Sequence, residues 1–162
     1  GSFEGLRVGI VGDIAHSRVC GSLVPALKKM GAQVVLIAPA TLLPARPDVL
    51  GADEVTPYLD EVLPSLDVVY MLRIQMDRLE NAPFPSLREY HLLYGLNEQR
   101  SYLMKDDAII CHPGPINRGV ELDSFMADGH KSVIVEQVFS GVSVRMALIY
   151  LLLGGANDEI AH

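Results

Sequence analysis

The chain has 162 residues, a length typical of one ordinary domain. Thirteen Lys and Arg residues against twenty Asp and Glu residues give a formal charge of −7, and there is no Trp. This composition argues against a nucleic-acid-binding protein, which usually carries a basic surface with stacking aromatics. The apolar fraction of 49% is high enough to bury a core, which excludes an intrinsically disordered chain.

The remaining global features predict a cytoplasmic protein without membrane contact. Cys20 and Cys111 are too few and too far apart for a disulfide framework or a cysteine metal site. The most apolar stretch, residues 146–156, is about half as long as a membrane-spanning helix. The N-terminus lacks the basic start and apolar run of a signal peptide. We interpret residues 1–4 as a cloning remnant and linker, and residues 5–162 as a single domain.

The first half of the chain alternates between apolar strands and helices. Residues 6–11 are a β-branched run ended by Gly12-Asp13, typical of a buried strand that enters a loop. A helix is expected over 17–30, with Ser17 as its cap and Pro25 as a kink or restart. The next expected elements are a strand over 34–38, a short helix over 58–66 and a strand over 67–72.

The second half begins with a long irregular stretch that contains Pro83 and Pro85. It continues with a helix over 97–104, a strand over 108–111 and a long final helix over 132–154. Continuous apolar strands that alternate with helices predict a parallel sheet covered on both faces. The predicted fold is therefore a doubly wound, Rossmann-like α/β domain with a long C-terminal helix.

Polar side chains follow three of these strands, where the carboxyl ends of parallel strands form a ligand-binding crevice. The three loops span residues 12–18, 73–78 and 112–119, and they hold four arginines, two histidines, a glutamine and an asparagine. A single arginine after a strand is commonly a solvated loop charge. Together, however, these groups predict a site for a small anion with more than one carboxylate, because guanidinium groups bind carboxylates through paired hydrogen bonds.

The turn Pro113-Gly114-Pro115 is the most constrained part of these loops. The prolines restrict the backbone and remove donors, which leaves the carbonyls of Pro113 and Gly114 able to accept hydrogen bonds from an amide or amine. A merely stiff loop is the alternative.

Three other chemistries are weakly supported. His16-Ser17 suggests a nucleophile and its base, but adjacent side chains seldom point at each other and there is no nucleophile elbow. Gly9-x-x-Gly12 lacks the third glycine and the acidic residue of a dinucleotide site. His112 lacks partners at metal-ligand spacing, which favours a structural role. No metal or cofactor is expected.

Taken together, the three loops resemble the amino-acid-binding half of the carbamoyltransferases, and among them those that use aspartate. The resemblance covers the chain from Gly5 onward, and its motifs occur in the family's order. They are Val11-Gly12-Asp13-Ile14-x-His16-Ser17-Arg18-Val19, Met71-Leu72-Arg73-Ile74-Gln75-x-x-Arg78 and His112-Pro113-Gly114-Pro115-x-Asn117-Arg118-Gly119-x-Glu121.

This resemblance implies roles for individual residues. Arg18, Arg73 and Gln75 would bind the two carboxylates of L-aspartate, and the carbonyls of Pro113 and Gly114 would contact the carbamoyl group and the attacking amine. The implied supporting residues are His16, Ser17, Asp77, Arg78 and His112. Asp77 stands where the family often has Glu, so its support of Arg73 would be looser. No catalytic residue is assigned to this half.

The resemblance also implies what lies outside this chain. The Ser-Thr-Arg-Thr and His-Pro-Thr-Gln segments, with which the family's first domain binds carbamoyl phosphate, do not occur in the sequence. The chain would then be inactive alone, its final helix would pack on the N-terminal carbamoyl-phosphate domain, and the full-length protein would be a homotrimer in pyrimidine biosynthesis. Two alternatives remain: a carbamoyltransferase specific for ornithine or an acylornithine, and a non-catalytic dicarboxylate-binding module.

Overall fold

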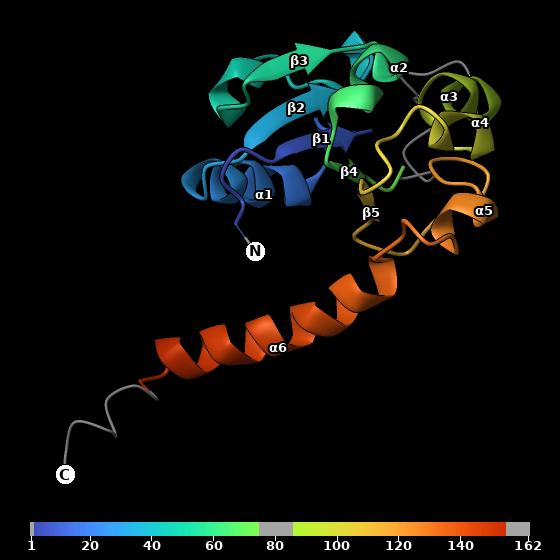
Figure 1. Ribbon diagram of the computed structural model, residues 1–162. Helices are drawn as coiled ribbons and strands as arrows, with labels where there is room; N and C mark the ends of the chain where they lie inside the picture. Colours follow the sequence, from blue (N-terminus) through green and yellow to red (C-terminus); the bar gives the residue numbers. More distant parts are fainter. Residues whose placement is uncertain (1, 75–85, 155–162) are drawn as a thin grey trace.

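The computed structural model describes residues 2–74 and 86–154, and its centre is a five-stranded sheet (Figure 1). The strands are β1 (Arg7–Val11), β2 (Gln33–Ile37), β3 (Glu54–Thr56), β4 (Val68–Met71) and β5 (Ile109–Cys111). They lie in the order β3-β2-β1-β4-β5, and all neighbouring pairs are parallel. The chain moves outward from β1 to β3 and then returns to the far side of β1. The switch point of the sheet therefore lies between β1 and β4.

The predicted doubly wound α/β fold is confirmed by this topology. Helix α1 (Arg18–Lys29) connects β1 to β2, whereas α2 (Leu59–Val62) and the 3-10 turn η3 (Leu63–Ser65) connect β3 to β4 in the opposite direction. Right-handed crossovers that run in opposite directions along a sheet place their helices on opposite faces.

Burial is deepest in the middle of the sheet. Residues 8–11 of β1 and 34–37 of β2 are buried without interruption, as expected of strands covered on both faces. Burial alternates in β4 and β5: Val69, Met71 and Ile110 are buried, whereas the residues between them are only partly covered. One face of the β4–β5 edge is therefore less protected than the rest of the sheet.

Helix α1 is one continuous element across Pro25, so the predicted restart at this proline is wrong. The proline ring lies on the exposed side of the helix. The predicted caps are confirmed at the N-terminus, where the Ser17 side chain accepts a hydrogen bond from the Cys20 N–H. Gly31, with a φ of 85°, follows the helix as expected.

Several short elements differ from the prediction. The predicted helix over 58–66 is divided into α2 and η3, because Pro64 tightens the second turn. The predicted helix over 97–104 is α4 (Glu98–Ser101), with Asn97 as its cap. The sequence did not predict four further elements: β3, α5 (Ser124–Ala127), and the 3-10 turns η1 (Ala40–Leu42) and η2 (Pro47–Leu50).

Helix α3 (Leu87–Tyr94) corrects the prediction of an irregular stretch at this place. It begins at Ser86, whose side chain accepts a hydrogen bond from the Glu89 N–H. Tyr90 and Tyr94 lie one helical turn apart, are buried, and stack with their ring centroids 5.5 Å apart. The sequence did not indicate this helix for two reasons. Prolines precede it closely, and its buried face consists of tyrosines rather than aliphatic residues.

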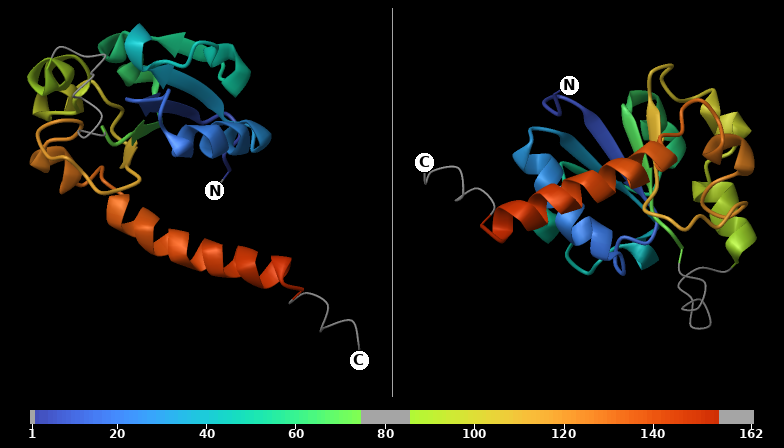
Figure 2. Two further views of the ribbon diagram at one scale, coloured as in Figure 1. Left: turned by 180° about the vertical axis from the view of Figure 1, so that it is seen from behind. Right: turned by 90° about the horizontal axis from the view of Figure 1, so that it is seen from below.

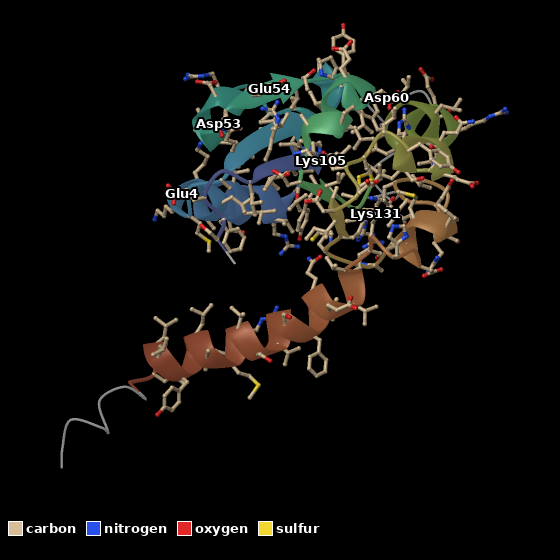
Figure 3. The ribbon with its side chains drawn as sticks, viewed as in Figure 1. Glu4, Asp53, Glu54, Asp60, Lys105 and Lys131 are labelled. Carbon is tan, nitrogen blue, oxygen red and sulfur yellow. The ribbon has the colours of Figure 1, made fainter. Side chains whose placement is uncertain are left out.

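Helix α6 (Ile134–Leu152) confirms the long final helix, but it extends away from the sheet (Figures 1 and 2). Ile134 is its only buried residue, and Phe139 and Leu152 are 80% and 84% exposed. Sticks project from the helix on all sides without reaching the sheet beyond its first turn (Figure 3). Gln137 provides the polar connection, since its Oε1 accepts from the His112 N–H at 3.0 Å and its Nε2 donates to the Tyr70 hydroxyl at 3.2 Å.

The expectation that no segment is long enough to cross a membrane is wrong for α6. The helix has 19 residues and is apolar enough, by length and composition alone, to span a bilayer. The predicted apolar stretch begins after Arg145, but the helix continues on the N-terminal side of this residue. Over its whole length the helix carries only two charged residues, Glu136 and Arg145. Such a helix requires an apolar environment on more than one side.

Candidate functional site

The loops after β1, β4 and β5 meet at the carboxyl edge of the sheet and enclose a pocket of about 190 Å³. Its position beside the β1–β4 switch point is where open parallel sheets bind ligands. The residues that line it come from all three loops and from the first turn of α1: Asp13, His16, Ser17, Arg18, Val19, Arg73, Pro113 and Gly114. Six of the ten predicted site residues are thus brought together.

Two exposed guanidinium groups give this pocket its positive charge. Arg18 is the first residue of α1, and Arg73 follows β4. Within residues 2–74 and 86–154, neither side chain has a hydrogen bond or a salt bridge, so both can bind a ligand. The first turn of α1 contains no acidic residue, and its backbone N–H groups add to the positive potential. The arrangement favours an anion.

The loop after β1 is shaped by Gly12 and Asp13. Gly12 has a φ of 127°, which few other residues adopt. The Asp13 carboxylate accepts from the His16 N–H at 3.2 Å and from its ring Nδ1 at 2.8 Å, which holds the imidazole beside the pocket. Asp13 is not among the residues predicted for the site. Its place in the first motif, as the carboxylate that directly follows the β1 strand, would have indicated it.

The turn after β5 lines the pocket with Pro113 and Gly114. Gly114 has a φ of 67°, and its peptide bond to Pro115 is cis. The Gly114 N–H donates to the His112 Nδ1 at 2.8 Å. Within the two described segments, the carbonyl oxygens of Pro113 and Gly114 accept no hydrogen bond, so both can accept one from a ligand.

A fully buried pair, His112 and Glu121, supports this turn from behind; both are 0% exposed. The His112 Nδ1 accepts from Gly114, so its ring proton lies on Nε2 and is directed to the Glu121 Oε1 at 3.2 Å. The same oxygen accepts from the Asn117 N–H at 2.6 Å. Both nitrogens of His112 are therefore engaged away from the pocket, which fits positioning rather than proton transfer.

Asn117 also joins two of the loops. Its Nδ2 donates to the Ile74 carbonyl at 2.8 Å, which ties the loop after β5 to the loop after β4. Arg118, in the same motif, forms two hydrogen bonds of 2.7 Å with Asp128 and does not line the pocket. The predicted residues Gln75, Asp77 and Arg78 lie outside the described residues.

The other chemistries considered from the sequence find little support here. Ser17 caps α1, and a Cβ added at Gly9 would meet the end of the Leu66 side chain, so Gly9 lies at a close packing contact that needs no nucleotide. Burial raises the pKa of Cys20 and of Cys111 to about 11, which keeps both thiols protonated and poorly nucleophilic. In the described parts of the chain, no group of three His, Cys, Asp or Glu side chains is placed to hold a metal ion.

Comparison with known proteins identifies the family. The family model for the aspartate/ornithine carbamoyltransferase Asp/Orn-binding domain matches residues 4–152. The chain belongs to this family. It is 51% identical over 158 residues to an aspartate carbamoyltransferase catalytic subunit from Desulforapulum autotrophicum, and 54% identical over 159 residues to the one from Syntrophotalea carbinolica. Each match covers 98% of this chain and 50% of the relative.

Solved carbamoyltransferases share the fold. An aspartate transcarbamoylase from Trypanosoma cruzi, in complex with N-(phosphonacetyl)-L-aspartic acid, superposes with a TM-score of 0.76 at 26% identity, over 93% of this chain and 50% of that one. The ornithine carbamoyltransferase from Pyrococcus furiosus has a TM-score of 0.79 at 24% identity, over 96% of this chain and 52% of that one, and the likeness to it concerns the fold alone. The chain thus spans about half the length of the family members it matches.

Proposed function

We propose that this chain is the aspartate-binding half of an aspartate carbamoyltransferase, which converts carbamoyl phosphate and L-aspartate to N-carbamoyl-L-aspartate and phosphate. The observation that carries the proposal is the pocket itself: Arg18 and Arg73, which have no partner among the described residues, line one crevice together with the Pro113-Gly114 turn. Cations suit the two carboxylates of aspartate, and carbonyls suit its amine. The names of relatives 51–54% identical to this chain support aspartate as the substrate.

Each loop then has a defined task. Arg18 and Arg73, with Gln75, bind the carboxylates through paired hydrogen bonds, and Asp77 and Arg78 support them. His16 and Ser17 shape the loop before α1. The Pro113 and Gly114 carbonyls accept from the amine and from the carbamoyl NH2, and His112 holds their turn in place through Glu121. Ornithine would require acidic groups for its side-chain cation, whereas the side chains here are predominantly basic.

The reaction needs positioning more than side-chain chemistry. The neutral α-amine attacks the carbonyl carbon of carbamoyl phosphate, a C–N bond forms, the bond to the phosphate oxygen breaks, and the amine loses a proton. Preset donors and acceptors lower the barrier by orienting the amine and stabilising the developing charge. This half orients aspartate, and a carbamoyl-phosphate domain polarises the second substrate.

The proposal extends to the whole protein. An N-terminal carbamoyl-phosphate domain completes the site, covers α6, and assembles with it into a cytoplasmic homotrimer that serves pyrimidine biosynthesis. The exposed apolar surface of α6 supports a covering domain. On this view, the chain alone binds aspartate and does not catalyse its carbamoylation.

A carbamoyl-transfer assay with labelled carbamoyl phosphate tests this proposal. Aspartate and ornithine are offered in parallel to the chain alone and to the chain with the first domain of a relative more than 50% identical. We expect product from aspartate only when both halves are present. Product from the chain alone would place catalytic groups in this half. Absence of product from a folded and associated pair would favour the non-catalytic binding module.

The substitution Arg73→Ala tests the pocket directly. Calorimetry should show at least a tenfold loss of affinity for L-aspartate, since a charge-assisted hydrogen bond contributes about 1.5–3 kcal/mol. Arg88→Ala removes an exposed arginine of α3 that lies outside the pocket, and it should leave the affinity unchanged. Equal affinities for Arg73→Ala and the parent chain would remove Arg73 from the site.

A further inference from the structure

Gln137 joins helix α6 to the turn after β5, although it does not itself line the pocket. Its Oε1 accepts from the His112 N–H at 3.0 Å, and its Nε2 donates to the Tyr70 hydroxyl at 3.2 Å. Gln137 belongs to the first turn of α6, His112 directly follows β5, and Tyr70 belongs to β4. One partly buried amide side chain therefore connects three separate elements.

The His112 backbone determines which way the Gln137 amide lies. A backbone N–H can only donate, so the Gln137 atom that faces it is the oxygen. The NH2 group is then directed to the Tyr70 hydroxyl, which can accept. The reversed amide would place two donors against each other at His112, so both contacts together allow only one orientation of this side chain.

His112 passes this constraint on to a carbonyl of the turn. Its ring Nδ1 accepts from the Gly114 N–H at 2.8 Å. That N–H belongs to the same peptide group as the Pro113 carbonyl, and in a trans peptide the two point in opposite directions. The place of the His112 ring therefore determines where the Pro113 carbonyl points, and the His112 backbone is in turn held by Gln137.

These contacts bear on only one half of the proposed aspartate site. The carbonyls of the turn are the groups proposed to accept from the amine, whereas Arg18 and Arg73 are proposed to bind the carboxylates. The two arginines come from α1 and from the loop after β4. Among the described residues they form no hydrogen bond to the turn or to α6. A change at Gln137 should thus be felt by the amine and not by the carboxylates.

We propose that Gln137 is a positioning residue for the amine of the substrate: from α6 it holds His112, and through it the Pro113 carbonyl, where the amine binds. This inference rests on the proposed function and deepens it. It predicts that the Gln137 amide contributes to the affinity for a dicarboxylate that carries an amine. Succinate is the matched ligand, because it has the two carboxylates of aspartate and no amine.

Calorimetric titration of the chain with L-aspartate and with succinate tests this role. Gln137→Ala should weaken aspartate binding by about threefold to tenfold, the change that corresponds to roughly one hydrogen bond. Succinate binding should change by less than about twofold, since this ligand has no group for the carbonyls of the turn. Glu136→Gln changes the neighbouring, exposed residue of α6 and should leave both affinities at their parent values.

Two further variants separate positioning from a general structural role. Gln137→Glu keeps an oxygen that accepts from the His112 N–H, and the Tyr70 hydroxyl can donate to its second oxygen. It should therefore retain the parent ratio of the aspartate and succinate affinities. Tyr70→Phe removes only the hydroxyl that Gln137 contacts, and it should weaken aspartate binding less than Gln137→Ala does. Its control is Tyr102→Phe, at an exposed position outside the aspartate pocket.

NMR spectra of the parent chain provide a second readout. The side-chain NH2 signals of Gln137 are identified by their absence from Gln137→Glu. They should shift when aspartate is added, because the amine engages the turn that Gln137 holds, and stay in place when succinate is added.

The outcomes are distinct from those of the proposed function. Equal losses of aspartate and succinate affinity in Gln137→Ala and in Tyr70→Phe would overturn the role of Gln137 while leaving the dicarboxylate site in place. Unchanged affinities for both ligands in these variants would overturn it as well. Binding of neither ligand by the folded parent chain would overturn the proposed function, and this inference with it.

Discussion

The loop after β5 and helix α6, which are separated in the chain by α5, are stabilised in opposite ways. The loop, residues 112–121, contains no regular secondary structure, but its two fully buried ionisable side chains, His112 and Glu121, hold it through hydrogen bonds of 2.6–3.2 Å. Helix α6 is regular over 19 residues, and only Ile134 is buried. Regular backbone and tertiary stabilisation are therefore separate properties. The loop is held by its own domain, whereas most of the helix is left uncovered by the described residues.

The largest loss of stability is expected when the buried pair of His112 and Glu121 in this loop is disrupted. Glu121→Ala leaves the Asn117 N–H and the His112 Nε2 without an acceptor, so the free energy of unfolding in urea should fall by about 3 kcal/mol. Glu121→Gln keeps an acceptor oxygen and should lose less. Glu136→Ala makes the same change at an exposed position of α6 and should cost at most about 0.5 kcal/mol. Similar losses for Glu121→Ala and Glu136→Ala would contradict the comparison.

Asp67 provides a case of intermediate burial, since its side chain is 26% exposed. Its carboxylate accepts from the Arg7 N–H at 2.7 Å and from the Lys105 ammonium at 2.6 Å, and these bonds hold its pKa below the ordinary value. Asp67→Asn should therefore reduce stability by about 1–2 kcal/mol at pH 7.

The lowered pKa of Asp67 also determines how this contribution depends on pH. The stabilisation is fully present above the unfolded-state pKa of about 4, and it is lost as pH falls through the lower folded-state value. Unfolding curves measured from pH 6 to pH 2 should thus converge for Asp67→Asn and the parent chain. A difference that stays constant at low pH would show that the ionised carboxylate is not the source of the stabilisation.

The smallest effect on folding, and the largest on association, is expected on α6. We expect the parent chain to self-associate through this helix at high concentration, because its exposed apolar side chains are continuous along it. Replacing Leu148, Leu151 and Leu152 with Lys should abolish association in sedimentation experiments and change the unfolding free energy by less than about 0.5 kcal/mol. A parent chain that remains monomeric throughout would contradict this expectation.

Much of the fold could be predicted because its signals are local. Apolar runs located four of the strands, and Ser17 and Asn97 marked the beginnings of their helices through single side-chain hydrogen bonds. The signals failed where tertiary contacts decide the structure. The short strand β3 forms because its backbone pairs with that of β2. Helix α3 is stabilised by two buried tyrosines, which an aliphatic pattern in the sequence does not indicate.

The candidate site divides in the same way. The sequence by itself determined which chemistry is available, since the residue types and their places after the strands do not depend on the rest of the fold. Arg18, Arg73 and the Pro113-Gly114 turn were predicted in this way, and they line one pocket. Only the tertiary structure decided how these groups are arranged. It pairs Asp13 with His16, turns His112 away from the pocket toward Glu121, and leaves α6 exposed, because strand order and burial determine which side chains meet.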